Sequence, residues 1–200
     1  MDLRRTLLLF SFIFTGSLAI AQPKDRWTIQ DGGAIRWSIN DNIPHDDHLE
    51  MSGQQLSVVL RYGVDAQKRF HLNRSLVFPM LRMHPNKTQN NLKQRFDVNI
   101  PALVTVDDQT LLNEEVRDVT FNGIMRVESS FGYIYRRKEL KDAVQLTRVL
   151  YPSTNAAHYC EEYTFKNSSP NQITLRVPEW NVIYTTPEEA GVYGAYCIEA

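Results

Sequence analysis

A polar stretch from Asn42 to Gly53 gathers the residue types that most often carry out chemistry. It holds two histidines, three carboxylates, a proline and a glycine, and an alternating apolar run, residues 56–62, follows it. If this stretch is extended, Asp46, His48 and Glu50 share one face, because alternate side chains of a strand point the same way. Carboxylates and imidazoles on one face can hold a divalent metal. They can also line a cleft that binds sugar hydroxyls.

The same residues fit a turn at the start of a strand. Asp and Asn after a proline commonly fix turns by bonding to their own backbone, and His48 and Glu50 would then face solvent. His45 and Asp47 could instead form a carboxylate–imidazole pair that tunes a proton shuttle. The turn is the commonest of these structures, so we expect no metal or other cofactor. The face of Asp46, His48 and Glu50 stays a candidate ligand site.

Aromatic residues offer a second route to carbohydrate binding, because their rings pack on the C–H faces of sugars. Trp37, Trp180 and Tyr184 have this chemistry, and Glu179 and Asn181 flank Trp180. Buried aromatics also dominate sandwich cores, so core packing is the more frequent use of the tryptophans. The candidate ligand-binding residues are therefore Asp46, His48, Glu50, Trp37, Trp180 and Tyr184.

Paired carboxylates are what glycoside hydrolysis requires: an acid and a base or nucleophile, roughly 5–10 Å apart. Five adjacent pairs occur, at positions 46/47, 107/108, 114/115, 161/162 and 188/189. Adjacent residues on a strand point to opposite faces, and the pairs outside strands suit solvated turns. The sequence has no Gly-x-Ser-x-Gly nucleophile elbow and no Gly-rich phosphate loop. We therefore assign no catalytic residue.

Length and composition indicate one ordinary globular domain. The 200 residues are 42% hydrophobic and 22% charged. The net charge is −1, which argues against nucleic-acid binding, because such proteins carry a basic excess or stripe. The basic group at 135–138 is followed at once by acidic residues and is typical of a solvated turn.

The N-terminus has the pattern of a secretory signal peptide. Arg4-Arg5 precede the apolar run 6–20, and Ala19-Ile20-Ala21 offers small residues for cleavage. Residues 1–21 are thus a predicted signal peptide, and 22–200 the mature chain. The apolar run is shorter than the ~20 residues of a membrane span. We expect a secreted or periplasmic protein with no membrane contact after cleavage.

The two cysteines, Cys160 and Cys197, leave two possibilities open. Export permits a disulfide between them. Two unpaired, buried apolar cysteines fit the sequence equally well. No His/Cys spacing indicates a zinc site.

Most of the chain after Trp27 shows the two-residue alternation of half-buried strands. Residues 138–150 fit a helix or a strand, and we favour a strand from Val144. The alternation covers residues 56–62, 72–80, 96–100, 119–127, 159–165 and 173–177. Few helical segments remain, so the predicted fold is an all-β antiparallel β-sandwich, with few or no helices outside the signal peptide.

Turn signals separate these strands. Asn122-Gly123 supplies the positive φ angles of a two-residue type I′ turn and predicts a hairpin. Residues 167–171 predict the turn of a long hairpin that joins 159–165 to 173–177. Residues 63–68 indicate a turn, residues 85–91 a loop, and Pro79 an edge or bulge position.

Four segments carry a resemblance to a known family: DGGAIRW at 31–37, HDDHLEMSG at 45–53, LTRVLYPS at 146–153 and RVPEW at 176–180. With the exported N-terminus, their order resembles the N-terminal β-sandwich (supersandwich) domain of secreted bacterial glycosidases of the six-hairpin type. That group includes α-L-rhamnosidase-like and glycogen-debranching-like proteins. The resemblance covers most of the mature chain.

The resemblance implies a bacterial module that packs against a following helical toroid, which holds the catalytic carboxylates. Nothing in this sequence matches that toroid, and residues 191–200 look like a strand entering a sheet, so we expect the N-terminal part of a larger enzyme. The expected function is a non-catalytic module that supports the catalytic domain and lines its cleft for an oligo- or polysaccharide. The alternatives are a free-standing carbohydrate-binding protein and a small self-sufficient glycoside hydrolase.

Overall fold

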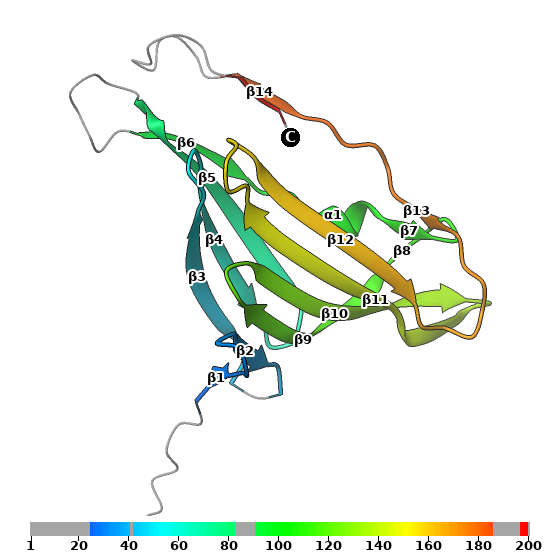
Figure 1. The fold of residues 1–200 in the computed structure, drawn as a ribbon. Coiled ribbons are helices and arrows are strands. Elements are labelled where there is room, and N and C mark those ends of the chain that lie inside the picture. Colours follow the sequence, from blue (N-terminus) through cyan, green and yellow to red (C-terminus); the bar gives the residue numbers. More distant parts are fainter. Residues whose placement is uncertain (1–24, 41, 83–90, 186–196, 200) are drawn as a thin grey trace, which may run out of the picture.

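Two antiparallel sheets packed face to face form the molecule (Figure 1). The structure is a computed structural model and describes residues 25–40, 42–82, 91–185 and 197–199. The six-stranded sheet has the order β1-β2-β9-β10-β11-β12, and the four-stranded sheet the order β3-β4-β5-β6. The strands of the larger sheet are β1 (Thr28–Ile29), β2 (Ile35–Ser38), β9 (Leu112–Phe121), β10 (Met125–Tyr135), β11 (Lys138–Pro152) and β12 (Tyr159–Asn167). Those of the smaller sheet are β3 (His45–Ser52), β4 (Ser57–Val64), β5 (Phe70–Arg82) and β6 (Asn91–Phe96). The predicted all-β sandwich is confirmed.

Short elements complete the described chain. A one-turn helix, α1 (Ile100–Leu103), precedes the hairpin of β7 (Thr105–Val106) and β8 (Gln109–Thr110). Strand β13 (Leu175–Arg176) pairs with β7, and β14 (Ile183–Thr185) pairs with β15 (Cys197–Glu199).

Two apolar clusters fill the interior. The larger lies between the two sheets, where Trp37, Leu60 and Val127 are each at most 1% exposed. The second lies against the other half of β10 and β11 and contains Tyr133 and Leu146. The alternation of apolar residues seen in the sequence contributes to both clusters, because alternate side chains of a strand point to the same face.

The hairpin predicted at Asn122-Gly123 is present, but its turn differs from the prediction. Met125 pairs with Phe121, so the loop has three residues, and of these only Gly123 has positive φ (75°). The expected two-residue type I′ turn is therefore wrong at this position. The β10–β11 hairpin has that geometry instead, since Arg136 and Arg137 connect the pair Tyr135–Lys138 with φ of 48° and 67°.

The long hairpin expected between residues 159–165 and 173–177 does not form. The turn at 167–171 exists, with the Asn167 side chain donating to the Asn171 carbonyl (2.8 Å). The chain then leaves β12, and Leu175 pairs with Val106 of β7, because it packs against the second apolar cluster. Strand β12 consequently has only β11 as a strand neighbour in the described chain.

The other predictions about strands, turns and loops had different outcomes. The segment 138–150 is strand throughout, and β4 extends to Val64, so the turn after it is shorter than expected. Pro79 lies where the β5–β6 register shifts between Phe78 and Arg82, which confirms the predicted irregular position. Cys160 is a free thiol. The predicted signal peptide and most of the loop at 85–91 lie outside the described residues.

Candidate functional site

The predicted polar face on β3 exists. Asp46, His48 and Glu50 are exposed, and they alternate along the strand with less exposed neighbours. Asp46 Oδ1 lies 2.6 Å from His71 Nε2. The two side chains meet over Gly63 of the strand between them, and a Cβ at this glycine would lie only 2.0 Å from that carboxylate oxygen. The glycine therefore makes room for a cross-strand contact between an imidazole and a carboxylate.

This face is a row of polar side chains along β3. Successive same-face residues of a strand are roughly 6.5–7 Å apart along the backbone. No cluster of three metal-ligating side chains occurs among the described residues. The cross-strand neighbours of His48 are Arg61 and, one strand further, Asn73, so the face carries donors as well as acceptors.

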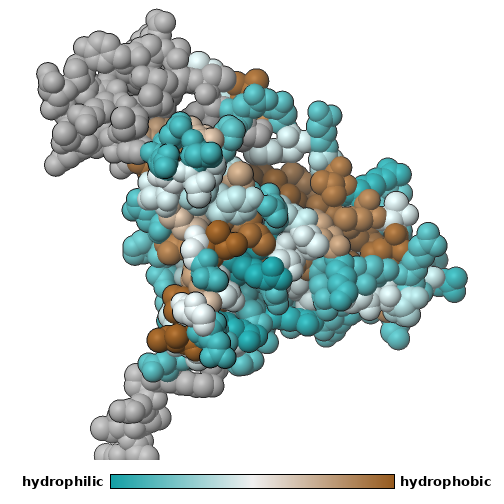
Figure 2. Space-filling view, viewed as in Figure 1, coloured by the Kyte–Doolittle hydropathy of each residue, from teal (hydrophilic) through white to brown (hydrophobic). Residues whose placement is uncertain are grey.

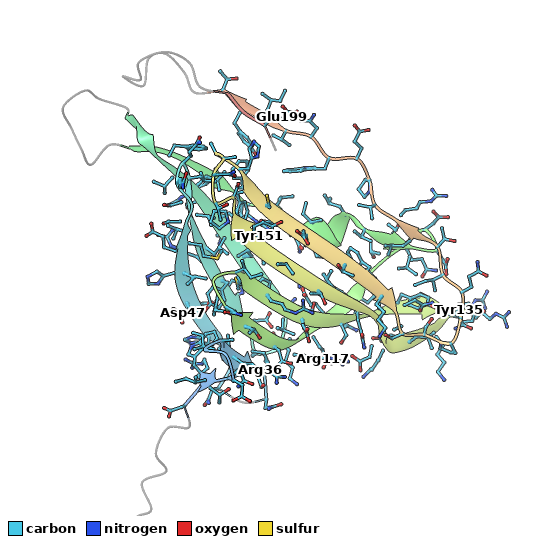
Figure 3. The ribbon with its side chains drawn as sticks, in the orientation of Figure 1. Arg36, Asp47, Arg117, Tyr135, Tyr151 and Glu199 are labelled. Atoms are coloured by element: carbon cyan, nitrogen blue, oxygen red, sulfur yellow. The ribbon has the colours of Figure 1, made fainter. Side chains whose placement is uncertain are left out.

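His45 and Asp47 lie on the opposite side of β3 and do not form a close pair. His45 Nε2 is 3.6 Å from the Asp47 carboxylate and 3.1 Å from Arg26 Nη1. A guanidinium only donates, so His45 Nε2 is the acceptor of this hydrogen bond. Asp47 (Figure 3) accepts the His48 backbone N–H at 2.8 Å. Burial, together with the Asp47 charge, raises the pKa of nearby Tyr62.

The three candidate aromatic residues occupy different environments. Trp37 is 1% exposed, and its ring packs in the core against Trp27 at a centroid distance of 5.9 Å. Trp180 is half-buried and lines a cavity. Tyr184 packs edge-on against Phe96, which lines the same cavity, at 5.1 Å. The structure thus brings Trp180 and Tyr184 to one side of the sandwich and leaves Trp37 in its interior.

That cavity, of about 540 Å³, lies on the open side of the sandwich, which we define as the gap between β12 and the β5–β6 pair. One wall is apolar and consists of Leu76, Phe78, Phe96, Val98 and Ile100. The other wall comes from β12 and presents Tyr159, Glu161 and Tyr163. The Tyr159 hydroxyl is buried and has no hydrogen-bond partner among the described residues.

A buried charge pair, Arg74 and Glu161, adjoins this cavity. Arg74, 4% exposed, donates two hydrogen bonds to the Glu161 carboxylate and one to the Val98 carbonyl (2.9 Å). The Tyr163 hydroxyl donates to the same carboxylate at 2.5 Å. Burial alone would lower the pKa of Arg74, but the bonds and charge of Glu161 outweigh burial and raise it. Burial, and then the Glu161 charge, raise the pKa of Tyr163.

The sequence contains a signal for this pair. Arg74 falls on the apolar phase of its strand, between Leu72 and Leu76. A charged residue at an inward position must find a counter-ion. Its partner comes from a strand 87 residues further along the chain, and the sequence pattern does not show which strand that is.

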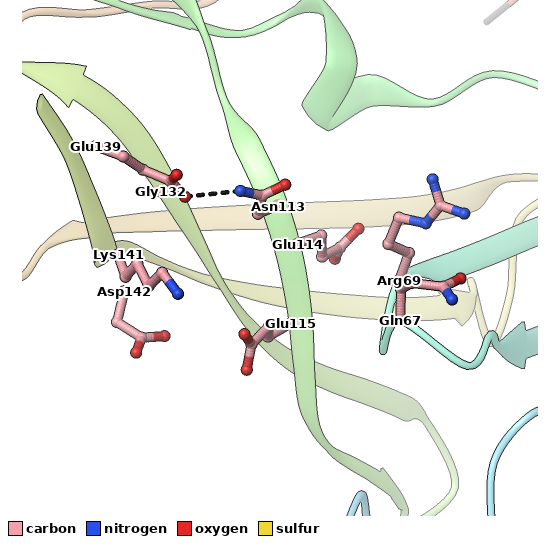
Figure 4. A pocket seen from close by; sticks show the side chains of 9 residues that line it. All are labelled: Gln67, Arg69, Asn113, Glu114, Glu115, Gly132, Glu139, Lys141 and Asp142. Atoms are coloured by element: carbon pink, nitrogen blue, oxygen red, sulfur yellow. Dashed lines mark hydrogen bonds between the residues drawn. The ribbon is translucent and has the colours of Figure 1, made fainter. Parts of the chain in front are cut away.

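A second, polar cavity of about 360 Å³ lies beside β9, β10 and β11 (Figure 4). The Asn113 amide donates to Glu139 at 2.6 Å, and Glu114 forms an ion pair with buried Arg148 at 2.7 Å. A hydrogen bond from Ser130 (2.5 Å), and then the Arg117 guanidinium, lower the pKa of Asp142. The residues lining the cavity are Gln67, Arg69, Asn113, Glu114, Glu115, Gly132, Glu139, Lys141 and Asp142.

The adjacent carboxylate pairs are largely engaged in structural contacts. Asp107 accepts the Thr174 backbone N–H (2.9 Å), Asp108 pairs with Arg176 (3.2 Å), and Glu162 accepts from the Tyr151 hydroxyl (2.5 Å). Glu114 and Glu161 hold the buried arginines, as described above. The pair 188/189 lies outside the described residues.

Asp118 is a further carboxylate held in its charged form. Burial alone would raise the pKa of Asp118, but hydrogen bonds from Arg36 Nε (2.7 Å) and Ser38 (2.8 Å) outweigh it and lower the pKa. Arg36 and Arg117, both labelled in Figure 3, belong to this end of the six-stranded sheet. Such a carboxylate stabilises charge and is a poor general acid.

Comparison with known proteins gives no match: neither a family model, nor a curated protein, nor a solved structure matches the chain. Within the described residues, no helix has the length and apolar character required to cross a bilayer.

Proposed function

We propose that the chain is a non-catalytic β-sandwich module of an exported glycoside hydrolase, which supports a helical catalytic domain and lines part of its sugar-binding cleft. The observation that carries the proposal is an uncovered apolar surface at the β1–β2 end. Ile29 is 82% exposed, its cross-strand partner Ile35 is 38% exposed, and Ile124, in the loop after β9, is 40% exposed. Figure 2 shows apolar side chains at this end of the molecule.

An apolar surface of this kind is typical of a contact with another domain. Isolated exposed apolar residues are common, but directly paired ones beside half-buried aromatics expose a continuous patch. Trp27 and Phe121, with ring centroids 5.3 Å apart, lie under Ile35, since Ile35 pairs with Phe121. The resemblance to six-hairpin glycosidases supplies the partner: a helical toroid that carries the catalytic carboxylates.

Three of the described carboxylates do not have the environment of a glycosidase acid. A glycosidase acid must be protonated near neutral pH, whereas the pKa values of Asp65, Asp118 and Asp142 are lowered. Hydrogen bonds from neighbouring side chains or backbone amides account for these shifts. The exposed face of Asp46, His48 and Glu50 on β3 is the surface we assign to sugar contact.

The test compares residues 22–200 with the full product of the natural gene, read beyond the codon for Ala200. We expect the gene to encode a helical domain, and we expect glycoside turnover by the full product only. The variant I29D should leave the unfolding free energy of 22–200 within about 0.5 kcal/mol, because Ile29 is 82% exposed there. It should lower the melting temperature of the full product.

Turnover of glycosides by residues 22–200 alone would overturn the proposal in favour of a small self-sufficient hydrolase. A gene without a helical domain would also overturn it. In that case the cavity lined by Trp180 favours the second candidate, a free-standing carbohydrate-binding protein. Saturable quenching of Trp180 fluorescence by oligosaccharides, lost in Trp180→Phe, would establish that candidate.

A further inference from the structure

Strand β12 forms a long and regular edge of the six-stranded sheet. Its nine residues pair with β11 without a register break, and no strand pairs with its other side within the described chain. Proteins blunt such edges with short strands, bulges, prolines, charged side chains or a covering segment. β1 has two residues, and β3 carries three carboxylates that would repel a second copy of themselves. β12 is neither short nor bulged nor interrupted by proline, and its exposed charges, Glu162 and Lys166, have opposite signs.

Two backbone hydrogen bonds show which groups of β12 point to the free edge. Ser153 N–H donates to the His158 carbonyl, and Ser168 N–H donates to the Ala143 carbonyl, both at 2.8 Å. Both pairs continue the β11–β12 register. In an antiparallel ladder, hydrogen-bonded pairs alternate with pairs that point away. Even-numbered residues of β12 therefore bond β11, and the N–H and C=O groups of Glu161, Tyr163 and Phe165 point outward.

We propose that a second copy of this chain adds to this edge, with β12 pairing antiparallel to β12 of the second copy. The charges of the strand fix the register. With Thr164 opposite itself, Glu162 lies opposite Lys166 of the second copy, and the twofold axis repeats this pair. Cross-strand pairs of opposite charge are favourable, and directly opposed like charges are not. A register centred on Glu162 would place this carboxylate opposite itself.

The same register matches the other side chains. Tyr163 lies opposite Phe165 of the second copy on the inner face, and Thr164 pairs with its own copy on the outer face, both favourable cross-strand combinations. The Glu162–Lys166 pairs are non-hydrogen-bonded pairs of the new ladder, where side chains approach most closely. The Tyr151 hydroxyl holds the Glu162 carboxylate on this outer face at 2.5 Å.

The exposed apolar side chains of the open side also favour a second copy of the chain as the partner of this edge. A twofold axis between antiparallel strands of one sheet is perpendicular to that sheet, so both four-stranded sheets lie on the same side. The two open sides then face each other. Leu103 is 39% exposed and Val177 is 61% exposed, and Figure 2 shows apolar side chains gathered over α1, β12 and β13. The second copy faces this surface.

The dimer is tested on residues 22–200 with a reductant present, by sedimentation equilibrium over roughly 1–500 µM. We expect a concentration-dependent dimer. E162K and K166E should each raise its Kd roughly tenfold, because each reverses two symmetry-related pairs. The double variant E162K/K166E restores both pairs with exchanged signs and should recover dimerisation. E115K is the matched control, since Glu115 is exposed on β9 inside the sheet, and it should leave Kd unchanged.

Hydrogen exchange gives a readout that does not depend on substitutions. The amides of Glu161, Tyr163 and Phe165 should exchange fast in dilute protein and slowly in concentrated protein. The amides of Glu162 and Thr164, bonded to β11, should exchange slowly at both concentrations. A chain that stays monomeric throughout overturns the proposal. So does a dimer that ignores both charge reversals, or one that forms only when the reductant is left out and thus depends on Cys160. None of these outcomes bears on the catalytic-domain proposal, which rests on the β1–β2 end.

Discussion

Arg74 and Glu161 join the two sheets through one buried ion pair. The Arg74 side chain is 4% exposed and that of Glu161 is 14% exposed. Removing one member of such a pair leaves an uncompensated charge, which costs about 3–5 kcal/mol. We expect E161Q to lower the free energy of unfolding by that amount, as measured by urea denaturation.

An exposed carboxylate of β9 provides the control for this prediction. E115Q changes a side chain that is exposed and should cost about 0.5 kcal/mol or less. The double variant R74M/E161M leaves no lone charge and should recover part of the loss. Equal effects of E161Q and E115Q would show that the Arg74 pair contributes little to stability.

The sequence predicted which side chains share one face of a strand better than it predicted which residues contact each other. The alternation in β3 correctly placed Asp46, His48 and Glu50 on one exposed face, because a strand has a fixed period. It did not predict that Asp46 contacts His71. That contact depends on which strands become neighbours and on the absence of a side chain at Gly63. Trp37 likewise could not be assigned to the core from its type alone.

The β10–β11 hairpin turns through two arginines in a conformation that favours other residues. Arg136 and Arg137 have φ of 48° and 67°, where a residue with a Cβ is disfavoured by roughly 1 kcal/mol. Arg136 also lies over the Tyr135 ring at 5.2 Å, so it is best retained. We expect R137G to raise the free energy of unfolding by about 1 kcal/mol.

The matched change at a strand residue without positive φ separates backbone strain from loss of charge. R126G replaces an exposed arginine within β10 and should destabilise the protein, because glycine weakens strand interiors. Thermal unfolding of both variants measures the difference. A loss of stability in R137G would mean that the arginine contacts outweigh the strain at this turn.

The sequence predicted the strands and hairpins that depend on residues close together in the chain. Strand alternation located most of the long strands, and Asn122-Gly123 correctly marked a hairpin. The predicted type of turn was wrong there, because one glycine with positive φ suits a three-residue loop as well as a two-residue turn. The predicted pairing of residues 173–177 with 159–165 was wrong for a different reason. The pairing of β13 with β7 depends on an apolar cluster assembled from distant segments.

The two apolar clusters belong to one sandwich because the same strands pass through both. Met125 and Val127 of β10 lie in the larger cluster, and Phe131 and Tyr133 of the same strand lie in the second. Strand β11 does likewise, with Leu150 in the larger cluster and Leu146 in the second. One cluster therefore cannot lose its packing without disturbing the strands that hold the other.

This continuity predicts a single cooperative unfolding transition for residues 22–200. Leu60 (0% exposed) and Leu146 (1% exposed) probe the two clusters separately. L60A and L146A should each cost about 2–5 kcal/mol, through lost burial and the cavity left behind. In each variant, tryptophan fluorescence and far-ultraviolet circular dichroism should shift together in urea, as two-state unfolding requires. If L146A shifts the dichroism transition and leaves the fluorescence transition in place, the second cluster unfolds by itself, and the chain holds two folding units.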